Sequence, residues 1–480
     1  MRDSIVFFLN GQRQEIAGST ANLTLAAWLR EHQRLVGTKV VCNEGDCGAC
    51  SVLVGRPTKD GDQLDYRPID SCIAFPFQLD KTHVVSVEGL KQDDCLSPVQ
   101  QAMVDCHGSQ CGFCTPGFVA TMHGMLEKQP SLDEASLRYG LSGNLCRCTG
   151  YVQIIEAGKS IDPASVVRMN DQYAAEPMLQ AFAELGDDTV HIDTGDVDLF
   201  LPTTIHQAIE LLSQNSGATV VAGATDYGVL HNHGRVNPTA IISLCSIADF
   251  GGIEVNDGQL CIGGGATWTD IEAFVRDRVP QYYEILTRFG SPQIRNAGTL
   301  AGNLAGGSPI GDSIPFHIVM DSELELTGPD GSRRVKLNDF YTGYRQNVMA
   351  DDELITSIIT PLPQDDERVS LHKISRRRDM DISTETLGLW VKLAGKTIQD
   401  VRLALGGVGA TVMRMTNAEK FLAGKTFGED NMRQAGRLAS ADIKPWSDVR
   451  GSDQYRLQLA ENLVVRAYRD IQREVMPNEG

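Results

Sequence analysis

The cysteines are the residues of this chain whose type and spacing could do chemistry. The sequence has 12 cysteines, and ten of them precede residue 150. Cys42, Cys47 and Cys50 form the pattern C-x4-C-x2-C, and 21 residues then separate Cys50 from Cys72. A tight loop with three thiolates and a fourth from a distant segment is typical of a plant-type [2Fe–2S] cluster. A disulfide pair or a structural zinc site is the alternative, but zinc knuckles favour two C-x2-C pairs and only one is present here.

A second group of cysteines follows. Cys111 and Cys114 form a C-x2-C pair, and 31 residues later Cys146 and Cys148 form a C-x-C pair. Each pair lies just before an expected helix start, where the positive end of the helix dipole would favour an anionic cluster. No thioredoxin-like βαβ pattern surrounds the first pair. From spacing alone, both a second [2Fe–2S] cluster and a zinc site remain possible.

The other four cysteines have no partner at ligand spacing. We expect them to be small buried hydrophobic residues. They are Cys95, Cys106, Cys245 and Cys261.

Charge and hydropathy narrow the class of partner. The formal net charge is −19, which argues against nucleic acid or an anionic membrane as the main partner. No apolar run approaches the ~20 residues that cross a bilayer. The N-terminus shows no secretory signal pattern, so we expect the protein to stay in the cytoplasm. Thiols in that reducing compartment stay free or bind metal.

The first 90 residues are expected to be rich in strands, with one early helix. Asn10-Gly11 between Ser4–Leu9 and Gln12–Ile16 predicts a hairpin with a type I′ turn. Apolar residues at helical spacing predict a helix over Ala21–Gln33. Further strands are expected at Val52–Val54 and Val84–Val87.

Residues 91–165 have the pattern of a small helical domain. Pro98 after Ser97 predicts one helix start, and Thr115-Pro116 predicts another, with that helix running toward Gln129. Ser131 with Glu134 predicts a capping box, Gly140 can end that helix, and a further helix is expected after Gly150.

Residues 166–198 are expected to form an acidic linker. From residue 170 to residue 198 there are eight acidic residues and no Lys or Arg, with at most one short helix at Met178–Leu185. Strands and helices then alternate over residues 199–365, and residues 366–480 form a last domain with strands and terminal helices. The predicted segments are therefore 1–90, 91–165, 166–198, 199–365 and 366–480.

Two segments of small residues could hold a nucleotide. Val221–Asp226 follows a strand but lacks G-x-G-x-x-G, so no Rossmann fingerprint is present. Small residues there would let backbone amides approach a pyrophosphate, although an ordinary strand-to-helix turn has the same composition. Residues 298–312 combine glycines with hydroxyl, amide and acidic side chains, which suggests a cradle for phosphate and ribose.

Three segments carry a family resemblance: Cys42–Cys50, Cys111–Gly117 and Gly143–Tyr151. They resemble the molybdenum hydroxylases, the family that includes xanthine dehydrogenase and aldehyde oxidase. The resemblance implies a second [2Fe–2S] cluster, held by Cys111, Cys114, Cys146 and Cys148. It also implies an α+β multidomain fold. In order, this fold has a β-grasp ferredoxin-like domain, a four-helix cluster domain and an α+β FAD-binding domain of the vanillyl-alcohol-oxidase/CO-dehydrogenase flavoprotein type with a C-terminal α/β subdomain.

The same resemblance implies flavin contacts. The FAD pyrophosphate would be wrapped by Ala222, Gly223, Ala224, Thr225 and Asp226, and Val221 before them would also bind the cofactor. Phosphate and ribose would be held by Thr299, Gly302, Asn303 and Asp312. Phe289 matches an aromatic residue that stacks near the isoalloxazine ring, and Arg376–Ser383 resembles a stretch on the flavin side.

The resemblance also implies a function. Within the family, the chain resembles the small subunit of a bacterial xanthine dehydrogenase, because nothing after residue 200 has the length of a molybdenum domain. A separate large subunit would carry the molybdenum cofactor and oxidise hypoxanthine or xanthine to urate, so no catalytic residue for that step is expected here. Electrons would pass through two [2Fe–2S] clusters to FAD and then to NAD⁺, in an α2β2 heterotetramer. The alternatives are the equivalent subunit of an aldehyde or other N-heterocycle hydroxylase, or a stand-alone electron carrier.

Overall fold

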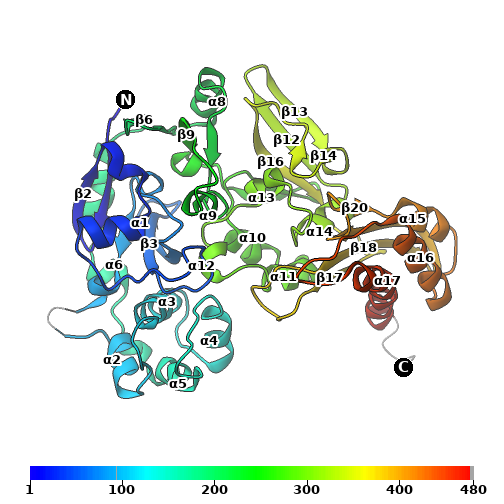
Figure 1. The fold of residues 1–480 in the computed structure, drawn as a ribbon, viewed down its shortest axis with the longest axis horizontal. Coiled ribbons are helices and arrows are strands. Elements are labelled where there is room, and N and C mark those ends of the chain that lie inside the picture. The colour runs from blue at the N-terminus through cyan, green and yellow to red at the C-terminus, as the bar shows by residue number, and fades with distance from the viewer. Residues whose placement is uncertain (93–94, 476–480) are drawn as a thin grey trace. The chain divides into compact units, whose positions relative to one another are not determined.

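The computed structural model describes residues 1–92 and 95–475 (Figure 1). The chain divides into two compact units. The first unit consists of Met1–Ala248 and Gly290–Gly298, and the second of Asp249–Phe289 and Thr299–Gly480. One short segment in the middle of the second unit's sequence therefore belongs to the first unit.

A five-stranded sheet forms the N-terminal part of the first unit. Its order is β2-β1-β5-β3-β4, and only the β1–β5 pairing is parallel. The strands are β1 (Ile5–Leu9), β2 (Gln12–Ile16), β3 (Ser51–Pro57), β4 (Leu64–Asp70) and β5 (His83–Val85). Asn10 and Gly11 both have positive φ, at 49° and 79°, as a type I′ turn requires, so the predicted hairpin is confirmed.

The early helix starts later than predicted. Helical residues run over α1 (Leu25–Ala27) and a π-helical turn (Trp28–His32). The hydroxyl of Thr24 accepts a hydrogen bond from the Ala27 amide at 3.2 Å and so caps the helix there.

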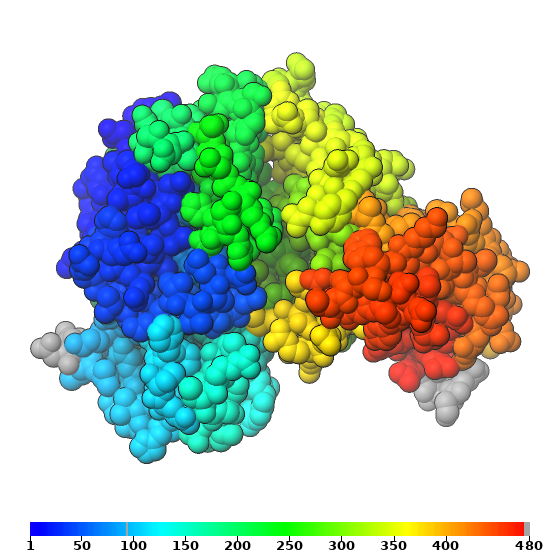
Figure 2. Space-filling model, in the orientation of Figure 1, coloured from blue at the N-terminus to red at the C-terminus, as the bar shows by residue number. Residues whose placement is uncertain are grey.

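Four helices follow, as predicted for residues 91–165. They are α2 (Pro98–Asp105), α3 (Thr115–Lys128), α4 (Glu134–Gly140) and α5 (Val152–Ser160). The predicted capping box at Ser131 is wrong, because the Asp133 carboxylate accepts from the Ser136 amide at 2.7 Å and begins α4. Figure 2 shows these helices, in cyan, in contact with the blue sheet domain.

The acidic segment 166–198 is more ordered than a linker. It contains α6 (Met169–Gln172), α7 (Ala175–Glu184) and β6 (Val190–Asp193). Met169, Met178 and Phe182 are buried in the core of the helical domain, and the acidic residues of α7 are exposed. The short helix predicted at Met178–Leu185 is confirmed by α7, whereas α6 and the burial of the segment were not predicted, because the charge pattern alone indicates a solvated stretch.

A second sheet of the first unit has the order β6-β7-β9-β8. Its other strands are β7 (Asp198–Leu201), β8 (Thr219–Val221) and β9 (Ala240–Ser243). The helices beside it in sequence are α8 (Ile205–Gln214) and α9 (Tyr227–Asn232), and α12 (Pro292–Arg295) completes the unit.

The second unit has two larger sheets and a two-stranded one. The first, of order β10-β11-β16-β12-β13, has the strands Ile253–Asn256, Gln259–Gly263, Leu354–Pro361, Glu323–Gly328 and Gly331–Lys336. The second has β17 (Glu367–Ile374), β18 (Glu385–Ala394), β19 (Thr397–Gly406) and β20 (Met413–Arg414). The small sheet pairs β14 (Tyr341–Gly343) with β15 (Gln346–Asn347).

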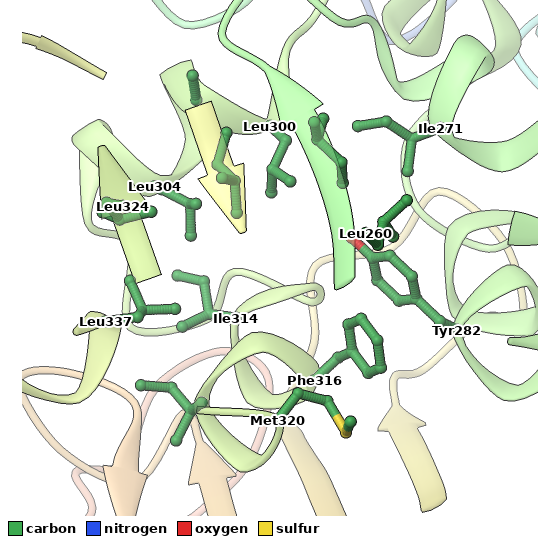
Figure 3. Packing of buried hydrophobic residues seen from close by; sticks show 14 of the residues in the cluster. Leu260, Ile271, Tyr282, Leu300, Leu304, Ile314, Phe316, Met320, Leu324 and Leu337 are labelled. Atoms are coloured by element: carbon green, nitrogen blue, oxygen red, sulfur yellow. The ribbon is translucent and has the colours of Figure 1, made fainter. Parts of the chain in front are cut away.

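Among its described residues, the second unit also has seven helices. They are α10 (Trp268–Val275), α11 (Pro280–Leu286), α13 (Leu300–Gly306), α14 (Ile314–Val319), α15 (Thr416–Leu422), α16 (Glu429–Asp442) and α17 (Asp453–Val475). Side chains of α10, α11, α13 and α14 share one core with the sheet β10-β11-β16-β12-β13, and Leu260, Leu300 and Phe316 are buried in it (Figure 3). The helices α15, α16 and α17 pack with β18 and β19 in a second core. No helix among the described residues has both the length and the apolar character needed to cross a bilayer. The five predicted segment boundaries stay predictions.

Candidate cluster sites and flavin-binding segments

The structure brings together the four cysteines of the first site, Cys42, Cys47, Cys50 and Cys72. The neighbouring thiols of Cys47 and Cys72 lower the pKa of the Cys42 thiol, and the thiol of Cys72 lowers the pKa of Cys50, so the four side chains lie close together. The loop before β3 supplies three of these residues, and the turn after β4 supplies the fourth. This is the arrangement that the spacing predicts.

Backbone amides point at the first site as well. The amides of Glu44 and Asp46 each donate to Cys42 Sγ at 3.4 Å. Hydrogen bonds from the neighbouring thiols and from these amides lower the pKa of the Cys42 thiol. The loop can curl around the sulfurs because Gly45 and Gly48 have positive φ, at 75° and 62°.

Apolar residues and one carboxyl enclose the first site. Cys50 and Cys72 pack with Ile73 and with Ile294 of α12. Asp70 Oδ1 lies 3.6 Å from Cys50 Sγ, and burial raises the pKa of this carboxyl well above its usual range. The side of the site formed by Cys50 and Cys72 is therefore shielded from water.

The second site also assembles as predicted, from Cys111, Cys114, Cys146 and Cys148. The thiols of Cys148 and Cys111 are 3.6 Å apart, and burial together with the neighbouring Cys146 thiol raises the pKa of the Cys114 thiol. Cys114 is the residue that precedes α3, as the dipole argument predicts. Cys111 and Cys148 are exposed, so this site lies at the surface of the helical domain.

Both sites fit a two-iron cluster. Within residues 1–92 and 95–475, no three or more His, Cys, Asp or Glu side chains are placed to hold a single metal ion. A [2Fe–2S] cluster needs four thiolates shared between two irons, so pairs of neighbouring thiols are the relevant arrangement. Each cluster would supply one-electron redox chemistry when bound.

The four cysteines outside the two sites are less buried than predicted. Cys95 is exposed, and Cys106, Cys245 and Cys261 are only partly buried. The prediction that these four are buried hydrophobic residues is therefore wrong. Cys245 Sγ donates to the carbonyl of Ala222 at 3.0 Å, so this thiol acts as a polar group.

The two cysteine sites are in direct backbone contact. The Leu145 amide, next to Cys146, donates to the carbonyl of Cys47 at 2.9 Å. A Cβ on Gly117 would lie 2.0 Å from the carbonyl oxygen of Gly48, which only a glycine in α3 permits. The sheet domain and the helical domain therefore contact each other at the segments that carry their cysteine sites.

The first flavin segment, Val221–Asp226, is a tight turn in the first unit. Ala224 adopts the left-handed conformation at φ 58°. In the part of the chain that the structure describes, the amides of Gly223, Ala224 and Thr225 donate no hydrogen bond. Free amides in such a turn form an anion-binding concavity, which fits a pyrophosphate. Each of the six predicted contacts stays a prediction.

The helix after this turn contacts the first cysteine site. Asn232, at the end of α9, donates through Nδ2 to the carbonyls of Asn43 (3.0 Å) and Cys72 (2.8 Å). His233 Nε2 lies 2.6 Å from Glu44 Oε1. One helix thus links the flavin turn to the loop that holds the first four thiols.

The second flavin segment lies in the second unit. Thr299 caps α13 by accepting from the Gly302 amide at 3.1 Å, and Asn303 Oδ1 lies 3.5 Å from Ser313 Oγ. The buried Asp312 carboxylate accepts from Lys373 Nζ and from Ser383 Oγ. Its role toward ribose stays a prediction.

Phe289 and the arginine-rich stretch also belong to the second unit. The Phe289 ring packs edge-on against Trp268, with ring centroids 4.7 Å apart. Arg376–Ser383 contains exposed arginines, and the Arg377 amide donates to Asp381 Oδ2 at 3.0 Å. Whether these residues contact flavin stays a prediction.

The sequence reasoning missed several residues that the structure places at these sites. They are buried or half-buried polar side chains from distant segments: Asn144, Asn232, Gln293 and Lys373. Single polar residues without a spacing pattern give no local signal. A buried Lys373 in a strand reveals its role only when Asp312 is seen beside it.

Comparisons with domain families match four parts of the chain. Residues 7–76 match a 2Fe-2S iron-sulfur cluster binding domain, and residues 86–159 match a [2Fe-2S] binding domain. Residues 195–363 match the FAD binding domain in molybdopterin dehydrogenase, and residues 370–471 match the CO dehydrogenase flavoprotein C-terminal domain. The predicted multidomain α+β fold class is confirmed.

Individual proteins are similar over most of this chain. Xanthine dehydrogenase 1 of Arabidopsis thaliana is 28% identical over 93% of the chain, and aldehyde oxidase 3 of Rattus norvegicus is 27% identical over 98%. The chain spans only 38% and 39% of the length of these two relatives.

A solved structure agrees with these matches. Carbon monoxide dehydrogenase from Hydrogenophaga pseudoflava is 27% identical, with a TM-score of 0.55, over 56% of this chain and 95% of that one. The four matched domains and these relatives agree with the two four-cysteine sites and the flavin segments. The chain therefore belongs to the molybdenum hydroxylase family, and it carries that family's two [2Fe–2S] domains and its FAD-binding domain.

Proposed function

We propose that this chain is the electron-transfer subunit of a xanthine dehydrogenase. A partner subunit with the molybdenum cofactor would oxidise hypoxanthine or xanthine to urate. Electrons would enter at the second cysteine site, pass to the first, and leave through FAD to NAD⁺. We further propose that the two subunits form an α2β2 heterotetramer. The protein would lie in the cytoplasm, where reducing conditions keep its eight thiols available for iron.

One observation carries this proposal: the two cysteine sites and the flavin turn lie in a continuous row within one unit. The Leu145 amide bonds to Cys47 between the two sites. Asn232 of α9 bonds to Asn43 and Cys72 between the first site and the turn. The exposed thiols of Cys111 and Cys148 offer the outer end of the row to a partner.

The residues of the chain would orient the groups and tune their potentials. Cys42 is bonded by two amides, and Cys146 Sγ lies 3.2 Å from Thr149 Oγ1, so the two sites have different hydrogen-bond partners. Hydrogen bonds to sulfur favour the more negative, reduced state of a cluster. None of these residues would need to act as an acid or base on the purine.

The test is purification of the chain from its native cells without oxygen. We expect a molybdopterin-containing chain to co-purify, and xanthine to bleach the visible absorption of the complex. Added NAD⁺ should restore the colour. Bleaching by an aldehyde or another heterocycle, but not by xanthine or hypoxanthine, would overturn the proposed substrate. Purification without a molybdopterin-containing chain would overturn the proposed partner.

A further inference from the structure

A buried glutamine lies between the two cysteine sites. Gln293, on α12, is 1% exposed and belongs to the segment 290–298 of the first unit. Its Nε2 group donates to three side chains: Ser51 Oγ at 3.1 Å, Thr121 Oγ1 at 3.1 Å and Asn144 Oδ1 at 3.0 Å. An NH₂ group has two hydrogens, so at least one of them is shared between two of these three acceptors.

Each acceptor lies in a segment that carries or directly follows a predicted cluster ligand. Ser51 directly follows Cys50, and Asn144 lies two residues before Cys146. Thr121 lies on α3, the helix that Cys114 precedes. A single amide therefore holds the ligand segments of both sites at once.

The same contacts converge on one carbonyl of the first loop. Ser51 Oγ donates to the carbonyl of Gly48 at 2.8 Å, and Asn144 Nδ2 donates to it at 3.1 Å. Gly48 lies between Cys47 and Cys50, beside the bond from the Leu145 amide to Cys47. The hydrogen bond from the Leu145 amide to the Cys47 carbonyl therefore completes an electron path from Cys47 to Cys146, in which every other link is a covalent bond of the chain.

The backbones beside Gln293 approach one another closely. A Cβ on Gly143 would lie 2.2 Å from Gln293 Oε1, and a Cβ on Gly48 would lie 2.5 Å from the carbonyl oxygen of Gly143. The two backbones are therefore as close as glycine allows. Moving the Gln293 amide must move the loop, the segment before Cys146, or both.

We propose that Gln293 is a positioning residue for electron transfer between the two clusters, because its amide holds the Cys47–Cys50 loop against the segment that precedes Cys146. This inference rests on the proposed electron-transfer role. The step that Gln293 serves moves one electron from the second site to the first, with no bond broken and no proton moved.

Hydrogen bonds suit this task better than apolar packing alone. An apolar side chain of similar volume would fill the space, but it would leave three buried acceptors without their donor. Directional bonds in a site of low dielectric select one arrangement of the two backbones. A small change of this arrangement changes the separation of the clusters without unfolding either domain.

The test compares three variants of the full chain, loaded with iron and reduced with dithionite. Gln293→Met removes all three hydrogen bonds at similar volume, and Thr121→Val removes one. Asn296→Ala is the control, because Asn296 lies in the same segment but donates to the carbonyl of Pro68 at 2.8 Å. The readout is the magnetic splitting of the electron paramagnetic resonance signals, which reports the separation and orientation of two reduced clusters.

We expect both cluster signals in every variant. Gln293→Met should lose the wild-type splitting, Thr121→Val should change it partly, and Asn296→Ala should keep it. Wild-type splitting in Gln293→Met would overturn the inference. If Gln293→Met fails to retain iron, Thr121→Val decides, and wild-type splitting there would overturn the inference. Clusters that are absent from the wild-type chain would instead contradict the proposed function.

Discussion

At the scale of residues, cysteine spacing predicts which thiols lie together. Spacing encodes ligands because a loop must deliver several thiolates to one point, and the structure gathers the two predicted sets of four. The residues around them were not predictable. Gln293 reaches Ser51 from 242 residues away, and no local pattern marks a contact of that kind.

Substitution of one exposed ligand tests the order of electron flow. Cys148→Ser should lose the second cluster, because serine replaces one of its four thiolates. In the complex with its partner, xanthine should no longer bleach the flavin, whereas NADH should still reduce it. Both results are read from visible spectra taken without oxygen.

Cys95→Ser is the matched control, since Cys95 is also exposed and lies outside both sites. It should behave as the wild-type complex does. Loss of flavin reduction by NADH in Cys148→Ser, with the first cluster intact, would contradict the assigned order.

At the scale of elements, turn and cap chemistry predicted some boundaries and missed others. Asn10-Gly11 defined its hairpin because both residues tolerate positive φ. The strand β4 was missed, since Pro68 and alternating charges hide it in the sequence. The start of α4 was misplaced because Asp133, not Ser131, caps that helix.

The close approach of α3 to the first cysteine loop is testable by adding one methyl group. In Gly117→Ala, the new Cβ would lie 2.0 Å from the Gly48 carbonyl oxygen, and that oxygen belongs to backbone. We expect a loss of about 1–3 kcal/mol in the free energy of unfolding. Iron content should fall as well, because the loop carries three ligands.

The control for this effect is Gly252→Ala, where an added Cβ meets no atom within 4 Å. Chemical denaturation and iron analysis of both variants make the comparison. Wild-type stability and wild-type iron content in Gly117→Ala would show that the two backbones are not in contact there.

One buried carboxyl in β18 predicts a dependence of stability on pH. Glu385 is fully buried, and among the described residues neither of its oxygens has a hydrogen-bond partner. Burial raises the pKa of Glu385 from 4.5 to about 9, and the Arg456 guanidinium opposes this rise. Between these values the folded chain holds a proton that the unfolded chain releases. The free energy of unfolding should therefore fall as pH rises, by at most about 1.4 kcal/mol per pH unit.

Denaturation of the wild type and of Glu385→Gln across neutral pH measures this slope. The neutral amide should remove the contribution, whereas Glu254→Gln, at an exposed position in β10, should leave it unchanged. A slope that is equal in the wild type and in Glu385→Gln would mean that Glu385 is ionised in the folded chain.

At the scale of the whole molecule, the sequence predicts consecutive segments, and the two compact units of the structure are each built from residues that are not consecutive in sequence. Segment 290–298 lies between parts of the second unit in sequence and belongs to the first unit in space. Prediction from sequence assigns neighbouring residues to one domain, so it cannot place segment 290–298 in a different unit from the residues on either side. The short helix α7 was predicted, but its packing into the core of the helical domain was not, because the acidic residues around it indicate a solvated linker.

The division into units predicts the response to loss of iron. All eight ligand cysteines lie in the first unit. Ligands that bind only the folded state stabilise the part that holds them. Removal of iron by a chelator, at constant flavin content, should lower the unfolding temperature of the first unit more than that of the second.

Calorimetry of the iron-loaded and iron-depleted protein resolves the two transitions. Protease digestion at intermediate temperature then identifies the unit that unfolds first. Equal shifts of both transitions would mean that the units do not unfold separately.

The central claim is that eight thiols of one chain hold two separate [2Fe–2S] clusters. Spin quantification by electron paramagnetic resonance of the anaerobically purified, dithionite-reduced chain tests it most directly. We predict two distinct signals of equal intensity, each corresponding to one cluster per chain. A single signal, or zinc in place of iron at either site, would contradict the claim.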